Sequence, residues 1–179
     1  MRLSTVKSRA RTPDGVVAFC AAIHPRLVGA LAYQCGNIGV AEELAQEALA
    51  RVWERWSTVH AMDSPEGWAF RVAFNLAASR FRRLAAEGRA TARIGARLTG
   101  ALTLPDAADA IAVRTAVASL PDRQRAAVVL RYFADLTVAD TAIAMGCQPG
   151  TVRTLTSRAI ASLRRRFDLV VPEEDHEHV

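Results

Sequence analysis

Apolar residues recur at helical spacing along most of the chain, and the regular alternation of apolar and polar residues that marks a strand is scarce. One stripe consists of Leu44, Ala48 and Val52, with Ala45, Leu49, Trp53 and Trp56 beside it. A second consists of Phe70, Phe74, Ala77, Phe81 and Leu84. Helices with such stripes bury one face against each other, so the sequence predicts an all-α fold.

Breakers and capping residues divide this pattern into separate helices. Ser64 is suited to be an N-cap and Pro65 to be the first helical residue. Pro25 predicts a break, or a new start, within an early helix. The expected helices cover residues 16–34, 40–56, 65–86, 111–119, 121–133, 137–145 and 149–167, with a loop at 57–65.

Small residues dominate the segment 87–110, which is typical of a flexible linker, with a transient helix at 92–98. We therefore expect two small helical domains joined by a flexible linker. The predicted division is an N-terminal extension (1–13), a first domain (14–86), a linker (87–110), a second domain (111–167) and an acidic tail (168–179).

The charge is unevenly distributed over the 179 residues, which carry 23 basic and 18 acidic side chains. Residues 1–83 carry 11 basic and 7 acidic side chains, and residues 111–171 carry 9 and 4. Residues 172–179 carry four acidic side chains and no basic one. The two basic blocks fit contact with a polyanion, and they fit two ordinary solvated surfaces equally well.

Several classes of protein are disfavoured. No run approaches the ~20 apolar residues of a membrane span, and residues 1–11 lack the apolar stretch of a signal peptide, which predicts a cytoplasmic protein without membrane insertion. Three widely spaced cysteines argue against a disulfide framework. Cys20, His24 and Cys35 lack a fourth ligand and paired spacing, so we interpret the cysteines as core residues and expect no metal. No catalytic or phosphate-binding motif is present, so neither an enzyme nor a cofactor is expected.

The segment 137–167 has a helix-turn-helix pattern: a short helix, a turn at 146–148 and a longer basic helix. Val138, Ala139, Ala142 and Met145 are expected to face Val152, Leu155, Ala159 and Leu163. The outward face of the last helix carries Arg153, Thr154, Ser157, Arg158, Arg164 and Arg165. Such a helix can enter the major groove of DNA, although an ordinary helical hairpin with a basic face has the same pattern.

A polar stripe follows the helix that starts at Pro65. It consists of Arg71, Asn75, Ser79 and Arg82, with Trp68 on the same side. An aromatic ring among arginines suits stacking on unpaired bases. Alternatively, Trp68 packs under the preceding loop as part of the core.

Four ordered runs resemble the extracytoplasmic-function sigma factors, the smallest class of the sigma-70 family. Residues 41–53 resemble the helix by which that family binds core RNA polymerase, and residues 68–77 with Arg82 and Arg83 resemble its next conserved helix. Residues 120–125 and 130–133 resemble the start of its second domain, and residues 146–153 resemble the turn into its recognition helix.

The resemblance implies an alternative sigma factor, which binds core polymerase and recognises two promoter elements, minus ten as a melted strand and minus thirty-five as duplex. The implied polymerase-binding residues are Glu43, Leu44, Gln46, Glu47, Arg51 and Trp53. The implied minus-ten residues are His60, Met62, Asp63, Trp68, Arg71, Asn75, Ser79, Arg82 and Arg83. The implied minus-thirty-five residues are Gln148, Thr151, Arg153, Thr154, Ser157 and Arg158. Many members are held inactive by an anti-sigma factor, so the resemblance makes such a partner an expectation.

The recognition helix departs from the family pattern. Leu155 stands where an arginine is common, and Thr156 stands where the family has a core leucine, so the core stripe is expected to use Leu155. Thr141 replaces a common isoleucine, which predicts a less stable domain or one that needs a partner. Two other functions stay open: a helix-turn-helix regulator that acts without polymerase, and a polymerase-binding adaptor. The acidic tail is either a shield for the basic helix or a solubilising segment.

Overall fold

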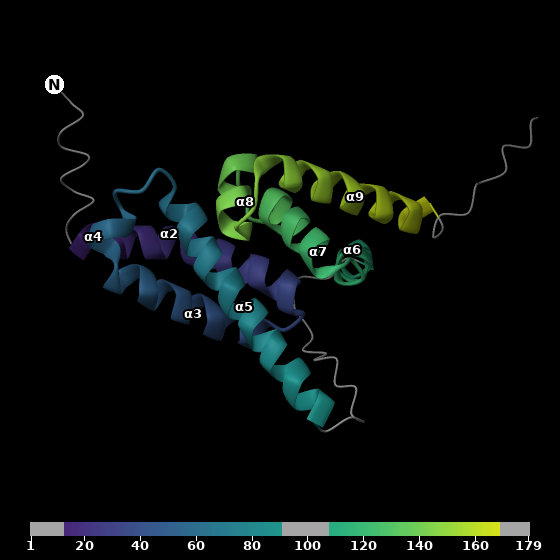
Figure 1. The fold of residues 1–179 in the computed structure, drawn as a ribbon, viewed down its shortest axis with the longest axis horizontal. Helices are drawn as coiled ribbons and strands as arrows, with labels where there is room; N and C mark the ends of the chain where they lie inside the picture. The colour runs from purple at the N-terminus through teal and green to yellow at the C-terminus, as the bar shows by residue number, and fades with distance from the viewer. Residues whose placement is uncertain (1–12, 91–107, 169–179) are drawn as a thin grey trace, which may run out of the picture.

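Two groups of helices pack against each other in this protein (Figure 1). The structure, a computed structural model, describes residues 13–90 and 108–168. The first group comprises α2 (Pro13–Cys35), α3 (Ile38–Glu54), α4 (Trp56–Val59) and α5 (Pro65–Ala90). The second comprises α6 (Ala108–Ala118), α7 (Asp122–Val128), the π-helical turn η1 (Val129–Phe133), α8 (Val138–Met145) and α9 (Pro149–Asp168). Within these ranges there is no strand, and the all-α expectation is confirmed.

The first group is built on an α2–α3 hairpin that α5 crosses (Figure 1). Gly36, at φ 72°, ends α2, and the Asn37 side chain caps α3 by accepting a hydrogen bond from the Val40 N–H at 3.0 Å. The fully buried side chains of Leu27, Leu31 and Phe70 form the centre of this group. The hairpin therefore presents the outer face of α3 to solvent, away from the core.

The expected break at Pro25 is wrong, because α2 runs through it. Pro25 and Ala21, whose carbonyl loses its helical donor, both lie on the exposed side of the helix. Water can satisfy that carbonyl, so the proline is tolerated.

Two other expectations in the first group need correction. The predicted loop 57–65 is shorter, because residues 56–59 form α4, where Val59 is buried and the Trp56 ring lies 5.1 Å from that of Phe19. The aromatic and aliphatic stripes also reach beyond the core: Trp53 is 53% exposed and Leu84 is 43% exposed. Leu84 lies on a stretch of α5 that is exposed all round, whereas Trp53 follows the fully buried Val52 and lies on the outer face of α3.

The predicted turn into the last helix is confirmed. Thr137 caps α8 by accepting a hydrogen bond from the Asp140 N–H at 3.0 Å, and α8 ends at Gly146 in the left-handed conformation, φ 59°. Glycine adopts this φ without the steric cost that a Cβ brings, so the chain turns at once into α9. On α8 the expected partner Ala139 is exposed instead, whereas Ala142 is buried.

The linker is only partly described. α5 continues to Ala90, beyond its expected end at residue 86, and α6 begins at Ala108, before its expected start at residue 111. The transient helix expected at 92–98 lies outside the described residues.

The larger apolar core extends through both groups, and a smaller cluster of Leu120, Val128 and Ala159 lies within the second group. Val129, Leu130 and Leu136 belong to the same buried cluster as Leu31 and Phe70. At its edge the rings of Tyr33 and Phe133 lie 4.0 Å apart between centroids.

Two arginines add polar contacts to this junction. Arg26 donates from Nε and Nη2 to the Ala134 carbonyl at 3.2 and 2.6 Å, and from Nη1 to Glu66 at 2.8 Å. Arg125 donates to the carbonyls of Gln34, Ala118 and Leu120 at 3.1, 2.7 and 3.0 Å. The guanidinium forks thus join the end of α2 to the second group.

The helix α2 is long and apolar enough to cross a membrane by length and composition, over Asp14–Cys35 with a mean hydropathy of 1.6. The expectation that no run reaches this threshold is therefore wrong for α2. A core helix passes the same test, and α2 supplies Ile23, Leu27 and Leu31 to the core, so the finding is weak evidence for a membrane segment.

Two threonines four residues apart in this region predict opposite effects on stability. Thr141 is fully buried, and its Oγ1 has no hydrogen-bond partner among the described residues, whereas Thr137 caps α8. We expect Thr141→Val to raise the free energy of unfolding by about 1 kcal/mol, because it removes an unpaired buried hydroxyl without changing the shape. Thr137→Val is expected to lower it by about 1 kcal/mol through the lost cap. Urea denaturation of both variants measures the two changes, and a destabilised Thr141→Val variant would contradict the assignment.

Candidate nucleic-acid interface

The helix α9 and the turn before it expose every residue that the sequence assigned to duplex recognition. Val152 and Ala159 are fully buried against the second group, which fixes the inward face. The exposed residues on the remaining surface are Gln148, Thr151, Arg153, Thr154, Ser157 and Arg158. The arrangement provides hydrogen-bond donors and acceptors near the N-terminus of the helix and arginines further along it.

Leu155 and Thr156, the two residues of α9 that depart from the family pattern, are neighbours in the sequence. Leu155 is half-buried, but it is not among the residues that pack against either apolar cluster of the described chain, so its predicted place in the core stripe is not confirmed. Thr156 is also half-buried, and its Oγ1 finds no hydrogen-bond partner in the described part of the chain. Neither residue is among the fully exposed side chains of α9.

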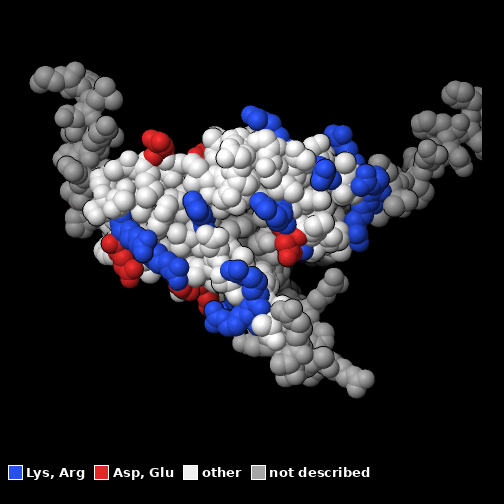
Figure 2. Space-filling view, viewed as in Figure 1, with Lys and Arg blue, Asp and Glu red and all other residues white. Residues whose placement is uncertain are grey.

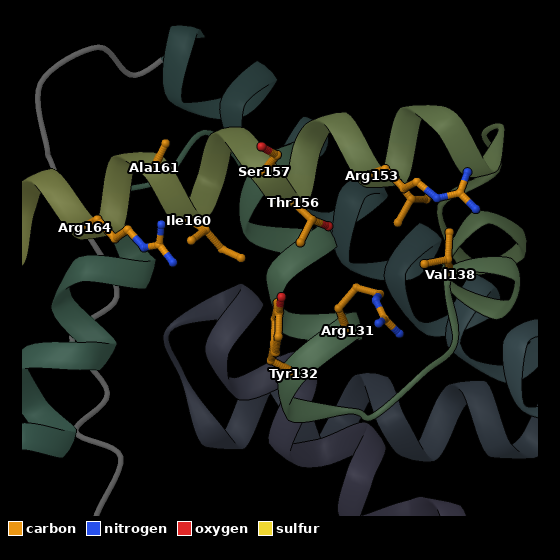
Figure 3. Close-up of a pocket in the computed structure, with 10 residues that line it drawn as sticks. Arg131, Tyr132, Val138, Arg153, Thr156, Ser157, Ile160, Ala161 and Arg164 are labelled. Atoms are coloured by element: carbon orange, nitrogen blue, oxygen red, sulfur yellow. The ribbon is translucent and has the colours of Figure 1, made fainter.

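Beside this surface lies a groove of about 430 Å³ between η1 and α9 (Figure 3). Arg153, Ser157 and Arg164 line it from α9, and Arg131 and Tyr132 line it from η1. The sequence pattern did not select Arg131 or Tyr132, because the fold brings them to α9 from a distant part of the chain. The spacing of residues within one helix cannot predict a groove that two separate segments form.

The stripe expected on α5 is also on the surface. Arg71, Asn75, Arg82 and Arg83 are exposed, and Ser79 is partly exposed and accepts a hydrogen bond from Arg82 at 3.1 Å. Trp68 is half-buried and packs against the core, so the structure supports the packing alternative for most of its ring.

The loop before α5 carries the other candidate residues. Asp63 is exposed, and His60 and Met62 are partly exposed. The His60 Nδ1 lies 2.6 Å from the Trp56 carbonyl oxygen. The Ser64 hydroxyl accepts a hydrogen bond from the Gly67 N–H at 3.0 Å, which confirms the predicted cap of α5.

Ser64 also connects this loop to α8. Burial raises the pKa of the Asp140 carboxyl, but hydrogen bonds from Ser64 and Thr137 lower it, and the net pKa lies below its usual value. A carboxyl with a depressed pKa stabilises the folded state above its ordinary pKa, and this contribution is lost as the pH falls through the lowered value. The contact therefore persists at neutral pH.

The helix α8 approaches α5 closely at Gly67. A Cβ there would lie 2.7 Å from Ser64 Oγ, 3.3 Å from the Asp140 carbonyl oxygen and 3.4 Å from the Ile143 side chain. Gly67, Arg71 and Asn75 recur every four residues and so share one face of α5. Consequently α8 covers the N-terminal end of the face that carries the polar stripe.

The outer face of α3 carries a third set of candidates. Glu47 and Arg51 form an ion pair at 2.5 Å, and Glu43 pairs with Arg80 of α5 at 3.1 Å. Gln46 is exposed and Trp53 presents a large aromatic surface, whereas Leu44 is buried in the core. Leu44 is thus placed to support the helix rather than to contact a partner directly. Figure 2 shows basic and acidic side chains side by side along the lower left edge of the molecule.

The cysteines and histidine considered for zinc do not form a ligand set. In the described ranges, no three His, Cys, Asp or Glu side chains are grouped so that they could hold a metal ion. Cys20 and Cys35 pack against the apolar core, and burial raises the pKa of the Cys35 thiol to about 12 although Arg80 and Arg125 lower it.

Comparisons with known proteins agree with this geometry. The family model "Sigma-70 region 2" matches residues 20–87, and "Sigma-70, region 4" matches residues 110–163. The "RNA polymerase sigma-E factor" of Streptomyces coelicolor is 31% identical over 127 residues, which cover 71% of each chain. The "ECF RNA polymerase sigma factor SigC" of Mycobacterium tuberculosis is 29% identical over 161 residues, 89% of this chain and 85% of that one.

Solved structures share the fold. The sigma factor RpoE of Bartonella quintana, in complex with the anti-sigma factor NepR, matches with a TM-score of 0.67 and 22% identity over 83% of this chain and 94% of that one. CnrH, in complex with the cytosolic domain of CnrY, matches with a TM-score of 0.64 and 18% identity over 94% and 97%.

The cysteine environments predict selective reactivity. The thiolate is the reactive form, and a pKa raised to about 12 by burial keeps the Cys35 thiol protonated at pH 8. We expect Ellman's reagent to modify Cys35 only in unfolding concentrations of urea, with Cys147, which lies outside the core cluster, reacting in the native protein. Mass spectrometry of the peptides identifies the sites, and rapid native modification of Cys35 would contradict its burial.

The close approach at Gly67 predicts that a methyl group loosens α8. We expect Gly67→Ala to lower the free energy of unfolding by about 1 kcal/mol, because either the Ser64 cap or the α8 contact must give way. Amide hydrogen exchange in α8 should accelerate as well. Gly39→Ala is the matched control, because its Cβ would meet one side-chain atom at 3.4 Å, an ordinary contact. Unchanged exchange in α8 would show that the contact tolerates a side chain.

Proposed function

This chain belongs to the sigma-70 family and is an alternative sigma factor of the extracytoplasmic-function class, and from that premise we propose which of its surfaces bind polymerase and promoter. Sigma factors are transcription initiation factors and not enzymes, so binding rather than catalysis is the task of these surfaces. The observation that carries the assignment is the exposure of three separate polar surfaces, on α3, α5 and α9, within the two matched regions.

We assign core-polymerase binding to the outer face of α3. Glu43, Gln46, Glu47 and Arg51 supply its polar contacts, Trp53 supplies a large aromatic contact and Leu44 holds the helix from inside. Exposed aromatic rings surrounded by charge are frequent hot spots of protein interfaces.

Minus-ten recognition is assigned to the loop at 60–64 and the α5 face. His60, Met62 and Asp63 surround the capture site for a flipped base, and the edge of Trp68 with Arg71, Asn75, Ser79, Arg82 and Arg83 follows the strand. Flipping costs a few kcal/mol, which stacking and phosphate contacts along such a path offset.

Minus-thirty-five recognition is assigned to α9. Gln148 in the preceding turn and the exposed residues Thr151, Arg153, Thr154, Ser157 and Arg158 of the helix are suited to contact base edges and phosphates of a duplex, as the second helix of a helix-turn-helix does.

Promoter binding requires the two groups to separate. Elements centred about 25 base pairs apart are about 85 Å apart along B-DNA, at 3.4 Å per base pair. In the structure α8 covers the end of the minus-ten face, so one protein cannot bind both elements in this arrangement. We assign the junction to the resting protein, which opens when polymerase binds, and we propose the cytoplasm as its location because core polymerase is there.

An anti-sigma factor is the proposed inhibitory partner. The named structural relatives RpoE and CnrH were solved with NepR and with the cytosolic domain of CnrY, respectively. A protein that binds the junction would hold the two groups closed.

The test is run-off transcription with purified core polymerase on fragmented genomic DNA. We expect discrete start sites that share two upstream elements. Trp53→Ala should weaken core binding at least tenfold, because it removes an exposed aromatic contact, and should reduce run-off product in parallel. Val17→Ala, at a residue of α2 that is 52% exposed, is the matched control and should change neither.

Other outcomes separate the alternatives. Core binding without start sites would favour a polymerase-binding adaptor. Specific duplex binding with no affinity for core polymerase would favour a regulator that acts alone, and would refute the assignment of α3.

A further inference from the structure

The groove between η1 and α9 is basic at its ends and apolar in its floor. Arg164 lies toward the C-terminal end of α9, Arg153 toward the N-terminal end, and Arg131 lies opposite Arg153 (Figure 3). Ile160 and Ala161 contribute apolar lining between Arg153 and Arg164. Among the described residues no acidic side chain lines the groove, and neither Arg153 nor Arg164 forms an ion pair.

We propose that the acidic segment 172–179 of this same chain docks in that groove. The segment follows α9 after Asp168, and it carries Glu173, Glu174, Asp175 and Glu177 without a basic residue. Figure 2 shows basic side chains gathered where α9 ends. The partner is thus a segment of opposite charge that is covalently held beside the groove.

The length of the connection fits the groove. With a rise of 1.5 Å per helical residue, Arg164 lies about 6 Å back from Asp168 along α9 and Arg153 about 22 Å back. At about 3.3 Å per extended residue, Glu173 is within about 17 Å of Asp168 and Glu177 within about 30 Å. After a reversal of direction the four carboxylates therefore span the stretch between the two arginines.

Docking would place carboxylates where the proposed function places phosphates. Arg153 and Ser157 belong both to the groove and to the minus-thirty-five surface. The segment would then compete with duplex DNA for α9 until polymerase or promoter displaces it. This consequence depends on the proposed function, whereas the docking itself does not.

Photo-crosslinking tests the docking directly. With p-benzoylphenylalanine in place of Tyr132, which is 59% exposed and lines the groove, we expect a crosslink within one chain to residues 169–179. The same probe in place of Val17, which is 52% exposed at the other end of the first group, is the matched control and should give none. Neutralising the segment (Glu173→Gln, Glu174→Gln, Asp175→Asn, Glu177→Gln) or adding 0.5 M NaCl should reduce the crosslink at least fivefold, because exposed ion pairs are screened.

Three results would overturn the proposal: no crosslink to the segment, a crosslink equally strong with the neutral segment, or crosslinks found only between two chains. The third would identify a second copy as the occupant.

Duplex affinity tests the competition with a control for net charge. We expect the neutral-segment variant to bind a 40-base-pair duplex roughly tenfold more tightly at 0.15 M salt, since competing anions are removed. In a third variant, residues 172–179 are moved in front of Met1, so the net charge is kept. This variant should bind the duplex as tightly as the neutral variant if docking requires the acidic segment to follow α9. Binding as weak as that of the unmodified chain would show that only net charge acts. If crosslinking succeeds and affinity does not change, the docking holds and the assignment of α9 to DNA is wrong.

Discussion

The placement of the α9 surface relative to those on α3 and α5 depends on the junction between the two groups, where two arginines add polar contacts to the shared apolar core. Arg26 donates to the end of η1 and to α5, and Arg125 donates to the last turn of α2 and to the end of α6. Carbonyls at helix C-termini lack intrahelical donors, and a planar guanidinium can satisfy two or three of them at once. An ammonium group on a lysine stem has no such fork, so the chemistry of arginine decides how the two groups meet.

Local patterns account for the helices because each is specified within a few residues. Ser64 caps α5, Gly146 ends α8, and the spacing of Val152 and Ala159 predicts the inward face of α9. The failures arise where distant contacts override the local signal. Pro25 is tolerated because its side of α2 faces solvent, and residues 57–59 become helical because Val59 and Trp56 pack on the first group.

The candidate sites also divide into those that local sequence patterns predict and those that depend on distant contacts. Residues on one helix, such as Arg71 and Asn75, could be found from periodicity because the exposed face follows from the buried one. The contact of Ser64 with Asp140 and the groove between Tyr132 and Ile160 could not, since each joins segments that are far apart in the sequence. The core shared by the two groups could not be predicted either. The basic segments and the linker do not indicate that the apolar faces of the two groups pack against each other.

The junction combines features that hold it with features that weaken it. The ion pair between Arg26 and Glu66, which holds Arg26 from within the first group, is a third to a half exposed, and such pairs contribute about 0–1 kcal/mol. A partner must bind the open state about 5.5 kcal/mol more tightly to convert a 99:1 closed population to 1:99. An interface the size of a polymerase contact can supply that difference, so a junction whose polar contacts are only partly buried suits a protein that must be closed when alone and open when bound.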